Sequence, residues 1–348
     1  MQISRTFTPI ALCTVVGLAL APSLRPLEVH AQPNAGFTFG AAGDFTNASN
    51  FHATANAVQA QKPDFFLALG DFSYSFRGEE EWCNYWRSLS VTNLLLIAGN
   101  HDTGESPGGN IDRYMRYCGN PFAKILTGKY GRQYYFDYPV GAPLARFIMV
   151  TPGIGGDTGG LDTNYAVNRQ GYKFTAEAID AARATGIKWI FVGMHKLYIN
   201  TLEKHDNEIS TDTKSTFMTM LLDKRVDVIL QGHEHGYERT KQLATNASTC
   251  PVVPTNDFDR DCVVNESDAL VKGAGTVIQI IGSAGKDMRS LKQGDEEFRY
   301  FVGRFAHQEL KAFGFGSFTV TANQVTYLYV RSAGPQFADT YTITTPTP

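Results

Sequence analysis

The chain has 348 residues, 43% of them hydrophobic and 19% charged, which is enough apolar material for a full-sized core and excludes an intrinsically disordered protein. Its 31 basic and 34 acidic residues give a formal net charge of -3, with no long basic run. Nucleic acids and anionic membrane surfaces are therefore not expected as partners. The length suits either one large α/β domain or two smaller ones.

The N-terminal segment predicts export. Arg5 precedes the apolar run IALCTVVGLALA, and the small residues at 29 and 31 suit signal-peptidase cleavage after Ala31. We therefore expect residues 1–31 to be a removed signal peptide, the protein to be secreted or periplasmic, and no stable membrane insertion afterwards. The alternative is an uncleaved anchor, which is disfavoured because the run is shorter than the ~18 residues of a spanning helix.

The cysteines predict disulfides. Removal of the signal takes Cys13 away and leaves Cys83, Cys118, Cys250 and Cys262, an even number in an exported protein. Local pairing, Cys83 with Cys118 and Cys250 with Cys262, is the economical choice among three connectivities. Zinc binding by these residues is disfavoured because no Cys-x-x-Cys occurs. Three glycosylation sequons, which matter only in a eukaryotic source, begin at Asn47, Asn246 and Asn265.

Along the chain, short apolar or β-branched runs alternate with helical patterns, which is the βαβ rhythm of a layered α/β fold. The helical patterns are NFHATANAVQAQ, TAEAIDAARATG and TKSTFMTMLLDKR. Five apolar runs end in polar residues: GFTFGAAGD at Asp44, DFFLALGD at Asp71, LLLIAGNHD at Asn100 and His101, KWIFVGMH at His195, and VDVILQGHEH at His233 and His235.

Two further pairs of runs predict antiparallel strands, RQYYFDYP with ARFIMVT and GSFTVTA with QVTYLYVRS. Together with the βαβ units, they predict two packed sheets flanked by helices. The segments GGNIDRY, GIGGDTGG and residues 240–272 are expected to be loops. We predict one domain over residues 36–331 and a C-terminal tail over residues 332–348, where TTPTP suggests a frayed end or the start of a linker.

The five strand ends predict a metal site. Ligands of open α/β sheets gather at the carboxyl ends of strands. A single strand-end Asp or His is most often a turn former or a structural residue, but five such ends indicate a shared role. Oxygen donors and imidazoles without thiolates suit Fe, Mn or Zn. The donors are too many for one ion, so we expect two ions that share a bridging carboxylate.

The order of the five blocks resembles that of the purple acid phosphatases, which are calcineurin-like metallophosphoesterases. The family pattern is Gly-Asp-x-Gly, Gly-Asp-x-x-Tyr, Gly-Asn-His-Asp/Glu, Val-x-x-His and Gly-His-x-His, and this chain has GDFT, GDFSY, GNHD, VGMH and GHEH. The stretch GHEHGYERT is similar to the plant-type members, without the N-terminal β domain of those long forms. The resemblance implies a four-layer α/β/β/α sandwich of two mixed sheets flanked by helices.

The resemblance also implies the ligands of a dinuclear centre. It assigns Fe(III) to Asp44, Tyr74 and His235, a divalent Fe, Zn or Mn ion to Asn100, His195 and His233, and the bridge to Asp71. Thr46 stands where the family has Gly. Wider relatives carry a histidine ligand there and lack the tyrosine, so Thr46 together with Tyr74 favours the purple subfamily.

Three more residues are implied in catalysis. His101 would face the substrate, binding the phosphate or protonating the leaving oxygen, and Asp102 would orient the His101 ring. His205, next to Lys204, stands where plant-type members place substrate-facing histidines.

We therefore expect a secreted acid phosphatase that hydrolyses small phosphate monoesters by attack of a metal-bound hydroxide. Five positive metal charges, less four from Asp44, Asp71, the Tyr74 phenolate and a bridging hydroxide, leave a net cationic pocket for phosphate. A phosphodiesterase with the same ligands, or a catalytically silent metal-containing binding protein, would also carry these motifs. The presence of His101 argues against the silent protein.

Overall fold

The computed structural model describes Gln2 and residues 36–346, apart from residues 47, 76, 92, 105–107, 157–158, 204–208, 210–213 and 306–310. Residues 33–348 form one compact unit. Three predictions therefore fall on residues outside the described part: the signal peptide apart from Gln2, the sequon residue Asn47 and the catalytic residue His205. Among the helices that can be described, none combines the length and the apolar character that a bilayer crossing requires.

The first sheet has seven strands in the order β12-β17-β16-β15-β1-β2-β3. Their bounds are β1 Phe37–Ala42, β2 Phe65–Ala68, β3 Leu94–Leu96, β12 Ala269–Val271, β15 Phe313–Val320, β16 Gln324–Ala333 and β17 Thr340–Thr344. β1, β2 and β3 run parallel to one another, as does β12 to β17, and the other pairs are antiparallel. The sheet is therefore mixed.

The second sheet has eight strands in the order β14-β9-β13-β8-β7-β6-β5-β4. Their bounds are β4 Thr127–Lys129, β5 Gln133–Tyr138, β6 Ala145–Met149, β7 Trp189–Gly193, β8 Val228–Gln231, β9 Tyr237–Thr240, β13 Val277–Ile281 and β14 Phe301–Phe305. The central strands β6, β7, β8 and β13 are parallel, and the outer pairs are antiparallel. Both predicted antiparallel pairs, β5 with β6 and β15 with β16, are confirmed.

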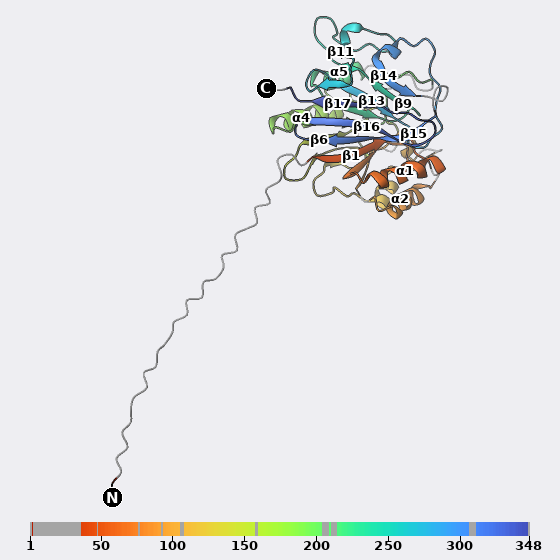
Figure 1. Cartoon of the computed structure of the whole chain (residues 1–348), viewed down its shortest axis with the longest axis vertical. Helices are drawn as coiled ribbons and strands as arrows, with labels where there is room; N and C mark the ends of the chain where they lie inside the picture. Colours follow the sequence, from red (N-terminus) through yellow and green to blue (C-terminus); the bar gives the residue numbers. More distant parts are fainter. Residues whose placement is uncertain are drawn as a thin grey trace. The chain divides into compact units, whose positions relative to one another are not determined.

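Helices cover the outer face of each sheet, as Figure 1 shows for α1 and α2. The helices are α1 Ser49–Gln61, α2 Glu79–Ser88, α3 Ile111–Cys118, α4 Gln170–Ala184 and α5 Lys214–Asp223. α1 packs on β15 and β16, α2 packs with α3, and α4 contacts both β6 and α5. The predicted sandwich of two mixed sheets flanked by helices is confirmed.

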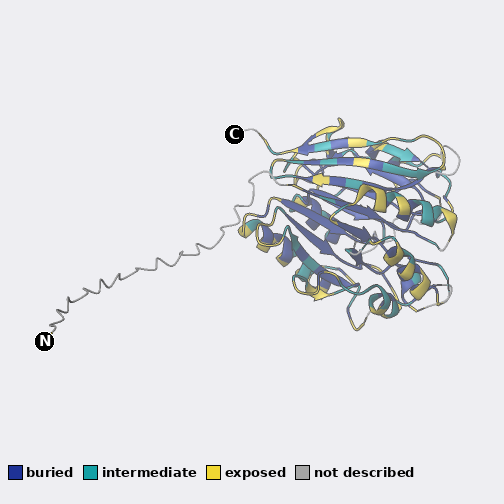
Figure 2. Ribbon diagram, turned by 60° about the horizontal axis from the view of Figure 1, so that its bottom comes forward, coloured by how far each residue is buried: buried dark blue, intermediate teal, exposed yellow. Residues whose placement is uncertain are grey.

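Aromatic rings fill the space between the sheets. Phe39 of β1 lies 4.5 Å from Phe318 of β15 and 4.9 Å from Phe147 of β6, measured between ring centroids. Successive side chains of a strand point to opposite faces. Accordingly Ile148, next to Phe147, belongs to a separate apolar cluster that includes Ile179 of α4. Figure 2 shows the buried strands inside and the exposed residues on the helices, the loops and the outermost strands.

Three expectations for irregular segments are wrong. The predicted loop GGNIDRY contains the start of α3, whose first turn is capped by the Asn110 side chain, which accepts hydrogen bonds from Asp112 N and Arg113 N. Residues 240–272 include β10 (Gln242–Leu243), β11 (Val263–Asn265) and β12. The predicted tail contains β17, whose alternating Tyr341 and Ile343 are buried against the core.

Both predicted disulfides are confirmed. Cys83 of α2 is bonded to Cys118 at the end of α3, with 4.9 Å between Cα atoms. Cys250 is bonded to Cys262 with 5.3 Å between Cα atoms. The first bond joins α2 to α3, which pack together, and the second closes the loop that precedes β11.

Candidate metal centre

The carboxyl ends of five parallel strands meet at one edge of the sandwich. β1, β2 and β3 of the first sheet and β7 and β8 of the second end in loops that carry predicted ligands. The loops contribute Asp44, Asp71, Tyr74, Asn100, His195, His233 and His235. All of these except Tyr74 and Asn100 are at most 2% exposed. The ends of these strands thus bring seven polar side chains together, five of them buried.

The backbone turns sharply where the strands end. Asp44, Asp71, Tyr74 and His233 all have positive φ angles, between 53° and 72°, a region that non-glycine residues rarely adopt. Gly70 precedes Asp71 with a φ of 91°, and a Cβ atom there would lie 2.5 Å from the Nδ1 of His195. These turns direct the side chains of neighbouring loops toward one another.

One half of the cluster joins Asp44, Tyr74 and His235. The Tyr74 hydroxyl donates to Asp44 Oδ1 at 2.8 Å and lies 2.9 Å from His235 Nε2. His235 Nε2 is in turn 3.6 Å from Asp44 Oδ1. The other ring nitrogen, Nδ1, lies 2.9 Å from the Asp287 carbonyl and carries the proton there. The lone pair of Nε2 therefore faces the phenol and the carboxylate.

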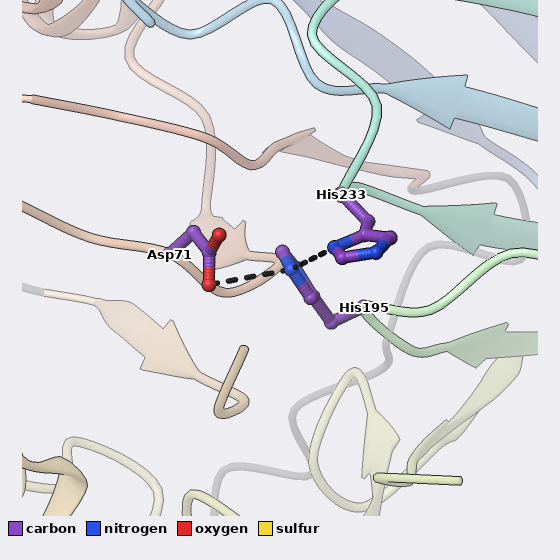
Figure 3. A group of neighbouring side chains, drawn as sticks. All are labelled: Asp71, His195 and His233. Carbon is purple, nitrogen blue, oxygen red and sulfur yellow. Dashed lines mark hydrogen bonds and ion pairs between the residues drawn. The ribbon is translucent and has the colours of Figure 1, made fainter. Parts of the chain in front are cut away.

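The other half surrounds the Nε2 atom of His195. This atom lies 3.1 Å from Asn100 Oδ1, 3.0 Å from His233 Nδ1 and 3.3 Å from Asp71 Oδ1. Figure 3 shows the two rings and the Asp71 carboxylate, whose ligand atoms lie within 4.8 Å of one another. His195 Nδ1 is 2.7 Å from the Leu69 carbonyl, which fixes its proton on that side.

Buried charges perturb the titration of this cluster. Burial raises the pKa of Asp44 to about 7, with a further contribution from the charge of Asp71. Burial alone would raise the pKa of Asp71, but the neighbouring His195 and His101 hold it below its ordinary value. Burial alone would lower the pKa of His195, but Asp71 and Asp44 raise it to about 9. Asp44 and His195 therefore hold protons near neutral pH, and a bound metal cation could displace these protons.

Burial also shifts the pKa of both ring systems of the Asp44 half. It raises the pKa of Tyr74 well above its ordinary value, assisted by the charges of Asp44 and Asp71. It lowers the pKa of His235 to about 3, assisted by the nearby Arg289. The charge of Asp71 therefore acts on both halves of the cluster. Carboxylate, phenol, amide and imidazole donors in this arrangement fit two hard or borderline metal ions.

His101 lies at the border of the cluster. Its backbone N–H donates to Asp71 Oδ1 at 2.9 Å, and its ring lies 4.6 Å from the Tyr74 ring between centroids. His101 is only partly buried, whereas Asp71, His195 and His233 are at most 2% exposed. This position suits a group that faces a substrate from the solvent side.

The Asp102 carboxylate accepts backbone N–H groups from Asp71 at 2.6 Å, Phe72 at 3.1 Å and Gly99 at 2.8 Å. Its expected role in orienting the His101 ring stays a prediction. Burial, assisted by the charge of Asp71, raises the pKa of Asp102 to about 8. Asp102 therefore ties the loop after β2 to the loop after β3 and positions the backbone of Asp71.

A sixth strand end, which was not among the five predicted, also reaches this edge of the sandwich. β13 is parallel to β8, and its loop begins Gly282-Ser283, the same apolar-run-then-glycine signal as in the other five. In this loop Lys286 N donates to the Asp44 carbonyl at 2.9 Å, and Arg289 N donates to the His235 carbonyl at 2.8 Å. The segment after β13 therefore lines the Asp44 half of the cluster.

A second feature that was overlooked is an acidic anchor beside the cluster. Glu238 of β9 accepts the Thr201 N–H at 3.1 Å on each oxygen and also the Thr201 hydroxyl. Glu297 accepts the Asn200 N–H at 2.9 Å. Both carboxylates are fully buried. They fix residues 200–201, which follow the loop of His195 in the chain.

Comparison with known proteins gives a consistent picture. The family described as Calcineurin-like phosphoesterase matches residues 37–237. The chain is 23% identical to Purple acid phosphatase 22 of Arabidopsis thaliana over 212 residues, covering 60% of this chain and 46% of that protein. It is 24% identical to Purple acid phosphatase 1 of Ipomoea batatas over 239 residues, covering 63% and 48%.

Among solved structures, a purple acid phosphatase named PPD1 from yellow lupin seeds is similar, with a TM-score of 0.65 and 16% identity. The similarity covers 90% of this chain and 54% of the lupin chain, and at this identity it shows the fold alone. An uncharacterized protein of Mycobacterium tuberculosis is 26% identical over 243 residues, covering 66% of this chain and 43% of that protein. The chain thus spans about half the length of these relatives.

Proposed function

Since the chain belongs to the calcineurin-like phosphoesterase family, we propose that it is an exported, dinuclear metal-dependent acid phosphatase acting on phosphate monoesters. The observation that carries this proposal is the division of the strand-end donors into two sets, one around Asp44 and one around His195, with the Asp71 carboxylate in contact with His195 and its charge acting on Asp44 and Tyr74. A single structural ion would not need seven donors. The relatives named purple acid phosphatases support the same reading.

We assign the ligands of each ion as follows. Fe(III) would be held by Asp44, Tyr74 and His235, a divalent Fe, Zn or Mn ion by Asn100, His195 and His233, and both by Asp71. One relative is named Fe(3+)-Zn(2+) purple acid phosphatase 12, from Arabidopsis thaliana, and is 22% identical over 226 residues, covering 62% of this chain and 46% of that protein. That name supports the assignment of one trivalent and one divalent ion.

The chain's own residues prepare this chemistry. When bound, the two ions would lower the pKa of water and offset the charge of the phosphate. His195 and His235 hold their Nδ1 protons on the carbonyls of Leu69 and Asp287, so their Nε2 lone pairs point into the cluster. Asp102 holds the backbone of Asp71 in place. These hydrogen bonds fix the donors before any ion arrives, which reduces the reorganisation that binding requires.

His101 would act on the substrate. Its ring borders the cluster on the solvent side, where the ester oxygen of a bound monoester would leave. A protonated imidazole at that position would bind the phosphate or donate a proton to the leaving oxygen. We expect an acidic optimum, because a proton donor must carry its proton before it can deliver it.

The test is turnover by metal-loaded protein. Purified protein supplied with iron and with zinc or manganese should hydrolyse an aryl phosphate monoester faster than the bis-aryl diester, with a maximum below pH 7. His52→Ala removes a histidine of α1 that lies outside the cluster and serves as the control, which should retain wild-type rates. Faster diester cleavage would indicate a phosphodiesterase. No turnover of either ester between pH 4 and 8 would indicate a catalytically silent metal protein.

A further inference from the structure

We propose that Lys286 is a substrate-binding residue, whose ammonium group binds phosphate oxygens beside the Asp44 half of the cluster. This inference rests on the proposed function and names a residue that the five motifs do not contain. The loop that carries Lys286 follows β13, the sixth parallel strand to end at the site edge. The position of Lys286, the contact it makes and its lack of an acidic partner among the described residues each support the proposal.

The backbone of Lys286 is fixed against the first ligand loop. Its N–H donates to the carbonyl of Asp44 at 2.9 Å, and the Ala284 N–H donates to the carbonyl of Gly43 at 3.1 Å. Two hydrogen bonds therefore join the segment after β13 to the segment after β1. The Cα atom of Lys286 is held beside a predicted metal ligand, so its side chain starts from a defined place.

The side chain reaches the ring of Tyr74. The Lys286 ammonium lies 4.6 Å from the centroid of that ring, and the Tyr74 hydroxyl contacts both Asp44 and His235. The His101 ring lies 4.6 Å from the centroid of the same tyrosine. Lys286 and His101 are both partly exposed, whereas Asp44 and His235 are buried. One cation and one proton donor thus contact the ring that borders the buried ligands.

Lys286 has no acidic partner among the residues that the structure describes. Other cations near this region are paired, since Arg289 approaches Glu234 at 4.0 Å and Lys292 lies 3.4 Å from Asp295. The neighbouring Asp287 is exposed and uses its carbonyl to accept a hydrogen bond from His235. A cation without a carboxylate, placed at the rim of a site for an anion, is suited to bind that anion.

A structural role would have a different signature. If Lys286 only stabilised the Tyr74 ring, its removal would change metal retention or the visible spectrum and would leave phosphate affinity unchanged. If it binds phosphate, its removal would weaken both the substrate and the product, and the metals would stay. The two roles therefore separate in measurements that do not depend on activity alone.

The test compares Lys286→Met and Lys286→Arg with the wild type. In metal-loaded protein, Lys286→Met should raise KM for an aryl phosphate and the inhibition constant of inorganic phosphate by about tenfold, as expected for one charge-assisted hydrogen bond at a partly exposed site, with kcat changed less than about threefold. Lys286→Arg keeps the charge and should recover most of the loss. The metal content of both variants should equal that of the wild type.

Lys272→Met is the matched control. Lys272 also lies over an aromatic ring, at 4.7 Å from the centroid of Trp189, but at the opposite end of β7 from His195. Its replacement removes the same charge and the same kind of ring contact, together with a 2.8 Å ion pair to the buried Asp227, and KM should not change. An equal increase of KM in both variants would overturn the proposal, because it would reflect overall charge or stability.

Unchanged KM and unchanged phosphate inhibition in Lys286→Met would also overturn it, as would loss of metal without loss of phosphate affinity per loaded site. If the wild type shows no turnover, the proposed function fails, and calorimetric titration of metal-loaded protein with inorganic phosphate still decides the role of Lys286. Weaker binding by Lys286→Met would support the proposal. Equal binding, or no binding by the wild type, would refute it.

Discussion

The bodies of the strands and their carboxyl ends have opposite properties, although only a few residues separate them. On β1, Phe39 is fully buried among aromatic rings of both sheets, and Asp44 just beyond the strand is a buried carboxylate with a φ of 62°. On β7, Phe191 packs 4.9 Å from Phe147, and His195 two residues beyond the strand faces Asp71. The same strands first build the core and then position the site.

This contrast shows where stability and function reside. Burial of large apolar side chains stabilises the fold, and buried charges and left-handed non-glycine residues cost free energy, on the order of 1–3 kcal/mol for each strained residue. Four predicted ligands have positive φ angles. The interior must therefore offset the strain at the strand ends. Substitutions in one region should change stability, and substitutions in the other should change metal binding and turnover.

The largest effect is expected for His233→Ala. Loss of this imidazole removes a donor that lies 3.0 Å from His195 Nε2 and disturbs the donors shared with Asp71, so the divalent ion should be lost and turnover should fall to background. Elemental analysis and kcat measure the two effects. Full activity with full metal content would show that His233 is not a ligand.

His101→Ala should be the next largest. Both metals should remain, because no ring nitrogen of His101 is assigned to either ion, and kcat should fall by about 10²–10⁴, the range of a positioned proton donor. Steady-state kinetics on an aryl phosphate with metal analysis of the same sample provides the check. Metal loss in this variant would place His101 among the ligands instead.

Phe39→Ala tests the other side of the comparison. Removing a ring that lies 4.5 Å from Phe318 and 4.9 Å from Phe147 should lower the free energy of unfolding by about 3–5 kcal/mol. Denaturant unfolding measures the loss, and kcat of the folded variant should stay near the wild-type value. A large loss of kcat in folded protein would mean that core and site are not separable.

The smallest effect concerns the pH dependence of stability at Glu238. Burial raises the pKa of this carboxyl group from 4.5 to about 8, so the folded state holds the proton more tightly than the unfolded chain. Its contribution to stability is present below pH 4.5 and is lost as the pH rises through 8. Glu238→Gln cannot ionise and should lose less stability than the wild type between those values. The free energies of unfolding of the wild type and of Glu238→Gln are to be measured at pH 5, 7 and 9. An equal dependence on pH in both proteins would contradict this prediction.

The strand bodies and most of the site were predictable because both follow local rules. The apolar runs ending in Gly and Asp, Asn or His marked the strands, and the parallel arrangement brought Asp71, His195 and His233 together as expected. The two disulfides followed from the even number of cysteines and local pairing. The ligand roles themselves stay predictions.

What the sequence did not reveal depends on distant or weak signals. The Asp102 carboxylate binds backbone amides about thirty residues away, and nothing in GNHD specifies those partners. The strand Thr340–Thr344 was hidden by the Thr-Pro repeat that follows it, although its own residues alternate between buried and exposed. Lys286 stands alone in a loop without a known motif, and only the three-dimensional contact with Tyr74 draws it into the site.

The central claim is that the strand ends bind one Fe(III) and one divalent ion, with Tyr74 as a phenolate ligand. The most direct test is metal analysis and the visible absorption spectrum of purified wild-type and Tyr74→Phe protein. We predict two ions per chain, one of them iron, a purple to pink charge-transfer band in the oxidised wild type, and loss of the band with a fall in iron in Tyr74→Phe. A colourless, fully active wild type with two divalent ions would contradict the claim and place the chain among the wider metallophosphoesterases.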